Sequence, residues 1–272
     1  MKYSLNFHKT FSPERDAIAQ LLRLSKQSDK FLTKEEISQL TTIPTGASSG
    51  KVVPNINYAE FMGLINVETK GKRFKVFPTI LGDIIYNEDP YFVESITLWS
   101  CHYNLVSKGS KAILWSFVFN ELVPQLGTEI QKEVLSNIVC KNFESEVNLT
   151  PLRSSYLNDT SFAALNIMID EGKNYIFTPH KIEPSYKYLY AYQLLSNWEK
   201  LAGDMTEITI TDLKEKLYFG VPYLWSDRDI LNVIELLQDE RIILINRQLN
   251  PLTIVRQESS QVLLSQIYSL LI

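Results

Sequence analysis

Four cations crowd one short segment of this 272-residue chain. Lys70, Lys72, Arg73 and Lys75 lie close together, and Glu68 is the only acid nearby. These residue types suit contact with phosphates, because ammonium and guanidinium groups neutralise a polyanion without reading its sequence. The chemistry that this segment predicts is electrostatic binding of nucleic acid, and a solvated hairpin is the alternative.

A helix expected just before this segment adds polar side chains. Lys51, Asn55 and Tyr58 fall on one of its faces at helical spacing. Asn and Tyr can bond base edges or phosphates, and Lys supplies charge. We therefore predict a nucleic-acid-binding set made of these three residues and the four cations: Lys51, Asn55, Tyr58, Lys70, Lys72, Arg73 and Lys75.

The start of that helix, GASSGK over residues 46–51, invites comparison with a phosphate-binding loop. Such a loop needs four residues between its glycines and a Ser or Thr after the lysine. Here three residues separate Gly46 from Gly50, Val52 follows the lysine, and no strand precedes the segment. The sequence argues against nucleotide hydrolysis here, although free N–H groups at a helix start can still meet a backbone phosphate.

Metal and nucleophile chemistry have little support. The three histidines, His8, His102 and His180, are far apart and lack a ligand-type neighbour at metal-binding spacing. Cys101 and His102 are adjacent, so on a helix their side chains point about 100° apart. Neither Cys101 nor Cys140 belongs to a CxxC pair. We predict no catalytic, metal or cofactor site.

The elements that must position the cations follow from periodicity. A helix is expected after Pro13, and Thr33 with Glu36 predicts a capping box at the next one. The helix carrying Tyr58 ends near Gly63, and residues 66–77 alternate like a two-stranded hairpin. This order is typical of a winged helix-turn-helix.

The rest of the chain predicts mostly helices. Segments 81–87, 91–106, 113–122 and 129–143 have helical patterns, and residues 186–256 repeat the N-terminal order of helices followed by paired strands. The predicted fold class is mainly α, with a winged-helix domain at 1–88, a helical middle at 89–184 and a second winged-helix-like domain at 185–272. Acids at Asp227, Glu235 and Asp239 in the last domain favour protein contact or internal packing over phosphate binding.

Composition limits the alternatives. Hydrophobic residues make up 45% of the chain and charged residues 21%, which is ordinary for a globular protein. The formal net charge of -4 argues against indiscriminate polyanion binding but allows a local basic patch. The N-terminus lacks an apolar signal core, and no apolar run approaches the roughly 20 residues of a membrane helix. We expect a cytoplasmic, soluble protein.

Several short blocks resemble the bacterial domain-of-unknown-function family numbered 4007. The resemblance covers roughly residues 1 to 120. Two departures stand out: Phe7 occupies the usual glycine position before His8, and Glu14 intrudes before Arg15. The blocks that carry the resemblance are residues 7–11 with Arg15, Thr45-Gly46, Gly50-Lys51, Tyr58, residues 62–65, Leu81-Gly82, residues 89–91, Leu98-Trp99 and His102-Tyr103.

What the resemblance implies is mainly context. The family is found beside sulfur-transfer enzymes of the phosphoadenosine-phosphosulfate reductase type, in DNA phosphorothioate modification and phage-defence islands. It implies an accessory or DNA-engaging role, with such enzymes or other defence proteins as partners, and no catalytic residues carry over.

From the residues and the resemblance together we expect a non-enzymatic DNA-binding accessory subunit that works as an oligomer or with a partner. One alternative is a protein-binding scaffold that docks a sulfurtransferase-like enzyme without touching DNA. A second is a hydrolase acting through His8 or His102.

Overall fold

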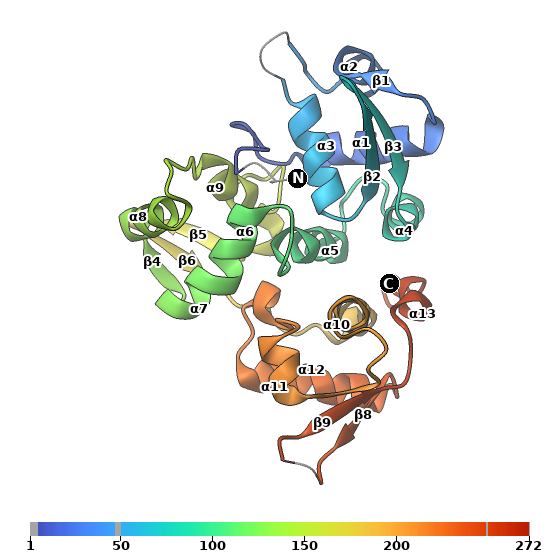
Figure 1. Ribbon diagram of the computed structural model, residues 1–272, viewed down its shortest axis with the longest axis vertical. Coiled ribbons are helices and arrows are strands. Elements are labelled where there is room, and N and C mark those ends of the chain that lie inside the picture. Colours follow the sequence, from blue (N-terminus) through green and yellow to red (C-terminus); the bar gives the residue numbers. More distant parts are fainter. Residues whose placement is uncertain (1–4, 47–49, 249, 272) are drawn as a thin grey trace. The chain divides into compact units, whose positions relative to one another are not determined.

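The computed structural model describes residues 5–46, 50–248 and 250–271. The chain divides into two compact units, Met1–Thr178 and Pro179–Ile272 (Figure 1). The predicted three domains, 1–88, 89–184 and 185–272, stay a prediction about domain organisation. Ser48 and Ser49 of the GASSGK segment lie outside the described residues. Within the described residues, none of the helices is both long and apolar enough to cross a membrane.

The first part of the first unit positions the cations. Its hairpin tip lies beside helix α2 (Figure 1). The strands pair antiparallel in the order β1-β3-β2. The predicted capping box is confirmed, because Glu36 N–H donates to Thr33 Oγ1 and Thr33 N–H donates to Glu36 Oε2. The elements are α1 (Arg15–Gln27), β1 (Leu32–Thr33), α2 (Lys34–Thr41), α3 (Val52–Phe61), β2 (Ile65–Lys70) and β3 (Arg73–Pro78).

The core of this part forms where α1 packs on β3 and α3. Along α1, Ile18, Leu21 and Leu22 recur at helical spacing and are buried. On β3, Val76 is buried while its neighbours Lys75 and Phe77 are only partly covered. Because side chains alternate across a strand, the hairpin has one face toward this core and one toward solvent.

The second part of the first unit begins with two helices, of which α5 is buried on almost every side. Three consecutive helical segments follow, the middle one with π-helical hydrogen bonding. A second antiparallel sheet has the order β4-β6-β5. The elements are α4 (Ile80–Glu88), α5 (Ser95–Val106), α6 (Ile113–Phe117), the π-helix Val118–Leu122, α7 (Val123–Leu126), β4 (Glu129–Gln131), α8 (Lys132–Phe143), α9 (Thr150–Leu157), the 3-10 helix Ala163–Leu165, β5 (Met168–Glu171) and β6 (Asn174–Phe177).

The second unit has one long helix, α10, which packs on α12 and α13. Its sheet has the order β7-β9-β8, again antiparallel. The elements are the 3-10 helix Pro184–Tyr186, α10 (Lys187–Ala202), β7 (Glu207–Thr209), α11 (Ile210–Glu215), the 3-10 helix Val221–Tyr223, α12 (Asp227–Asp239), β8 (Ile243–Asn246), β9 (Thr253–Arg256) and α13 (Ser260–Leu264).

One order of elements recurs along the chain: helix, strand, helix, helix, strand, strand. It starts at α1, again at the α6–α7 segment, and again at α10. In each repeat the first strand pairs with the last, so the sheets have equivalent strand orders. The middle repeat was not expected from the sequence.

The mainly α fold class is therefore wrong, because each repeat contains a three-stranded antiparallel sheet and the chain is better described as α+β. The error is clearest at residues 129–143, which the pattern assigned to one helix. Residues Glu129–Gln131 instead form β4 and pair with β6, with Ile130 buried, and the helix starts at Lys132. A three-residue strand is too short for its alternating pattern to be distinguished from the first turn of a helix.

Candidate nucleic-acid interface

The four hairpin cations lie at the tip and along one side of β2 and β3. Lys70, Lys72 and Arg73 are exposed, and Lys75 is half-buried. Arg73 pairs with Glu36 at 3.5 Å and donates to the Phe31 carbonyl oxygen at 3.2 Å. In the part of the chain that the structure describes, Lys70, Lys72 and Lys75 form no ion pair, and Lys70 and Lys72 are exposed to solvent.

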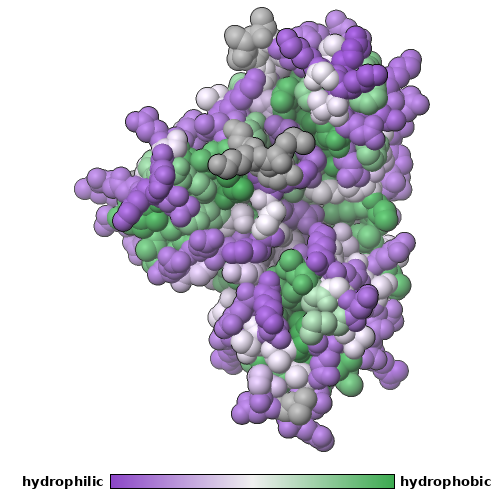
Figure 2. Space-filling model, in the orientation of Figure 1, coloured by the Kyte–Doolittle hydropathy of each residue, from purple (hydrophilic) through white to green (hydrophobic). Residues whose placement is uncertain are grey.

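Strand register determines which of these side chains act together. Lys70 lies opposite Arg73, and Glu68 lies opposite Lys75. Alternation along β3 then places Arg73, Lys75 and Phe77 on one face of the hairpin. Lys72 follows Gly71, whose φ of 61° makes the tight turn. Figure 2 shows hydrophilic side chains along the outer edge of the first unit, over α2 and the hairpin.

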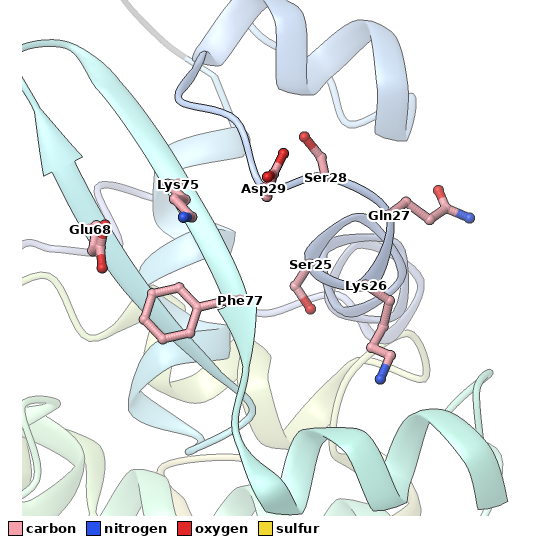
Figure 3. Close-up of a pocket in the computed structure, with 8 residues that line it drawn as sticks. All are labelled: Ser25, Lys26, Gln27, Ser28, Asp29, Glu68, Lys75 and Phe77. Carbon is pink, nitrogen blue, oxygen red and sulfur yellow. The ribbon is translucent and has the colours of Figure 1, made fainter.

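An open groove lies beside this face. Its volume is ≈ 430 Å³, and it is lined by residues 25–29, from the end of α1 and the loop after it, together with Glu68, Lys75 and Phe77. In Figure 3 the two strands supply one wall and the end of α1 supplies the other. Lys26 on that second wall is paired with Asp83. The groove therefore combines a partly exposed ring, one free cation and two carboxylates, Asp29 and Glu68.

The residues predicted on α3 are placed differently. Asn55 and Tyr58 are fully buried, and Lys51 pairs with Glu14 at 2.5 Å between Nζ and Oε1. Asn55 Nδ2 donates to the Lys51 carbonyl oxygen at 2.9 Å. Neither Asn55 nor Tyr58 can reach a nucleic acid from this position, so we withdraw both as base contacts. Lys51, which directly precedes α3, is paired with Glu14, so the four hairpin cations are the part of the predicted set that a nucleic acid can reach.

The N-terminal segment is what covers α3, and sequence reasoning missed it. Asn57 Nδ2 donates to the Phe7 carbonyl oxygen at 3.2 Å, and the Tyr58 hydroxyl donates to the Phe11 carbonyl oxygen at 3.0 Å. The Phe7 ring packs edge-on against Tyr58 and Phe61. The sequence indicated this segment only through the family resemblance at residues 7–11, which does not predict the helix against which the segment packs.

Two of the histidines, His8 and His102, are buried. His8 is fully buried, its Nδ1 donates to the Lys9 carbonyl oxygen at 2.8 Å, and burial lowers the pKa of its imidazole. His102 is also fully buried, with Nδ1 2.9 Å from the Tyr156 hydroxyl. A hydrolase acting through either residue would need access to substrate that this burial denies. Burial also raises the pKa of the Cys101 thiol, which disfavours the nucleophilic thiolate.

The three acids that the sequence predicted on a helix of the last domain lie on α12 of the second unit. Asp227, Glu235 and Asp239 are exposed on α12, and Arg247 pairs with Glu235 at 2.9 Å. Helix α10 is rich in tyrosine. One of these residues, Tyr190, is fully buried, and its hydroxyl lies 3.1 Å from His180 Nε2. That tyrosine therefore serves the core of the second unit and offers no surface to a partner.

Comparisons with known proteins give one family and one fold. The family model described as "Protein of unknown function (DUF4007)" matches residues 7–163. Two crystal structures of SspB, one of them bound to magnesium ion, match with TM-scores of 0.74 and 0.73, each at 16% sequence identity. Each match covers 97% of this chain and 86% of the SspB chain. No curated protein matches this sequence.

Magnesium ion is bound in one of those SspB structures. The residues that the structure describes contain no group of three or more His, Cys, Asp or Glu side chains that could hold a metal ion.

Proposed function

This chain belongs to the DUF4007 family, and on that premise we propose that it is a non-enzymatic, DNA-binding accessory subunit of a bacterial DNA-modification or anti-phage system. The exposed cationic hairpin β2–β3 is the observation that carries the proposal. A phosphorothioation-type modification system, with a phosphoadenosine-phosphosulfate-reductase-like enzyme as partner, is the specific context that the family resemblance implies.

The chemistry supports contact with the DNA backbone. Lys70 and Lys72 are exposed and form no ion pair with the described residues, and Lys75 lies opposite Glu68. Arg73 can exchange its long contact with Glu36 for a phosphate. Ammonium groups on phosphates release counterions, which makes binding strongly dependent on salt. Because Asn55 and Tyr58 on α3 are buried, the binding is expected to depend little on base sequence.

The net charge of -4 limits the strength of this contact. A few cations on an otherwise acidic chain give modest affinity, since most of the surface repels a polyanion. An accessory subunit overcomes this low affinity by binding DNA together with a partner that is already bound to it. A second DNA-holding chain raises the effective concentration at the hairpin without any new contact by the hairpin itself.

The proposal is tested by replacing Lys70, Lys72 and Lys75 together with Ala and measuring duplex affinity by fluorescence anisotropy across a salt series. Each lost phosphate contact should lower the slope of log K against log salt by about 0.9. Lys173→Ala is a matched control, because Lys173 follows Gly172 in the β5–β6 turn as Lys72 follows Gly71 in the β2–β3 turn. Unchanged affinity and slope in the triple variant would remove this proposal.

The absence of enzymatic activity is tested separately. The full chain, incubated with supercoiled plasmid in the presence and absence of magnesium, is expected to leave the plasmid intact. If strand breaks increase with the concentration of this protein and disappear with EDTA, the non-enzymatic part of the proposal is contradicted, while the DNA-binding part remains.

A protein-docking scaffold is the second candidate, and one observation favours it. Ile80, Tyr91 and Val93 are 58%, 68% and 69% exposed, in neighbouring segments of the first unit. Exposed apolar side chains are typical of protein contacts where they form one patch. If the chain fails to bind duplex or heparin at low salt yet retains a reductase-like partner, and Tyr91→Ala with Val93→Ala releases that partner, the scaffold is the better description.

A further inference from the structure

We propose that the groove between the end of α1 and the β2–β3 hairpin binds an unpaired nucleobase, which stacks on the ring of Phe77. The inference rests on the proposed function, because it names the form of nucleic acid that the same hairpin prefers. Single-stranded DNA, or a duplex with an extruded base, would then bind better than an intact duplex.

The first argument is the position of Phe77. It lies two residues from Lys75 on β3, on the face of the hairpin opposite to buried Val76, and it lines the groove in Figure 3. A ring on this charged face keeps part of its apolar surface in water, which is unfavourable in the free protein. A stacked base would cover that surface, and stacking tolerates any base because each has a π-face.

The second argument is the order of charges along the face. From Phe77 toward the hairpin tip come Lys75 and then Arg73, with Lys70 opposite Arg73. Alternate residues of a strand are about 7 Å apart, so these cations form a track beside the ring. A nucleotide whose base lies on Phe77 can then extend its phosphates along the track, which is the arrangement of aromatic and cationic groups used to bind single strands.

The third argument concerns the two carboxylates of the groove. Glu68 lies opposite Lys75, and Asp29 lies on the far wall (Figure 3). Carboxylates repel phosphates, so the acids would be a handicap if only backbone entered the groove. They accept hydrogen bonds from exocyclic amino groups such as cytosine N4–H₂, however. The groove should therefore prefer cytosine to thymine, which offers no amino group.

An intact duplex cannot use this site. Its bases are stacked on their neighbours, and the amino group of each cytosine is already paired with guanine on the Watson–Crick edge. Extruding a base costs a few kcal/mol in a regular duplex and least where the strand is already unpaired. The hairpin cations remain available to a duplex, so the two forms of DNA should share the cationic track and differ at Phe77.

The test compares the full chain with Phe77→Leu, using labelled oligo-dC, oligo-dT and a duplex of the same length in anisotropy titrations at low salt. Leu keeps an apolar side chain on β3 and removes the stacking ring. Phe77→Leu should weaken oligo-dC binding about tenfold and leave duplex and heparin binding unchanged, since heparin carries charge without bases. Phe77→Tyr should retain the wild-type affinity. Phe74→Leu is the matched control, because Phe74 lies on the same strand with its side chain on the opposite face.

Two further variants keep the test decisive if Phe77→Leu unfolds. Glu68→Gln and Asp29→Asn change exposed carboxylates, and together they should reduce the preference for oligo-dC over oligo-dT. Single-strand binding that Phe77→Leu leaves at the wild-type level, or that Phe74→Leu weakens equally, overturns the groove as a base site. So does a dC-to-dT ratio that the carboxylate variants leave unchanged. If the wild type binds no DNA at all, the proposed function itself fails. If it binds duplex and single strands alike through the lysines alone, the proposed function survives without this site.

Discussion

The hydroxyl of Tyr58 on α3 donates a hydrogen bond of 3.0 Å to the carbonyl oxygen of Phe11 in the N-terminal segment. This contact joins positions 47 residues apart in sequence and holds the segment against the helix. Lys51 and Glu14 form a second link between the same two elements. Together they explain why α3, which the sequence suggested as a surface for DNA, is an interior helix.

Tyr58→Phe should destabilise the first unit and leave DNA affinity unchanged. The variant keeps the ring but removes the donor, so the Phe11 carbonyl oxygen loses its partner, at a cost of about 1 to 2 kcal/mol. Chemical denaturation measures the loss of stability, and anisotropy with duplex DNA measures binding. A variant that loses DNA affinity at unchanged stability would restore Tyr58 as a direct contact.

Gly82→Ala should be severely destabilising. Gly82 lies in the first turn of α4, and a Cβ there would meet the Leu64 carbonyl oxygen at 2.0 Å. That oxygen already accepts from Thr79 N–H at 3.0 Å, so the backbone cannot easily retreat. We expect a loss of about 3 kcal/mol in the free energy of unfolding, at the upper end of overpacking costs.

Thermal and chemical unfolding of Gly82→Ala provide the measurement, and Gly109→Ala is the control. Gly109 has open space around its added Cβ but a φ of +79°, so its substitution reports backbone strain without a clash. Equal losses in the two variants would contradict the steric explanation.

Stability should fall with acid because of His180. Burial lowers the pKa of its imidazole from the ordinary 6.5 to about 4. Between these values the unfolded chain binds a proton that the folded chain does not, so stability from this residue is present above pH 6.5 and lost as the pH falls toward 4. The slope should approach, at most, about 1.4 kcal/mol per pH unit.

An imidazole NMR titration of the full chain should find His180 neutral down to about pH 4. His180→Gln should reduce the acid slope of the unfolding free energy. His8 is also buried with a lowered pKa, so His8→Gln separates its share of that slope. A His180 midpoint near its ordinary value would show that the ring is solvated.

Local sequence features predicted the elements that depend on neighbouring residues. Thr33 and Glu36 predicted their capping box because both of its hydrogen bonds span three residues. Alternation over residues 66–77 predicted the hairpin, which the structure forms from Ile65–Lys70 and Arg73–Pro78 with Gly71-Lys72 as its turn. The same reasoning failed for β4, whose partner strand β6 lies more than 40 residues away.

The candidate site divides in the same way. Lys70, Lys72 and Arg73 are exposed as expected, because burying a charged side chain away from water is costly. The groove beside Phe77 could not be predicted, since its walls come from the end of α1 and from a hairpin about 40 residues later. Only packing brings Asp29 and Glu68 to one cavity.

The sequence by itself determined the cation cluster, the Thr33–Glu36 capping box, the hairpin and the family, all of which depend on residue type and short spacing. Tertiary structure decided which face of α3 is covered, which short segments pair as strands and where a groove opens. The physical reason is that burial and strand pairing depend on which distant segments meet. Tyr58 suits both a surface and a core, since its ring can pack and its hydroxyl can form hydrogen bonds. It is buried because the N-terminal segment packs on α3 and the Phe11 carbonyl oxygen accepts from its hydroxyl.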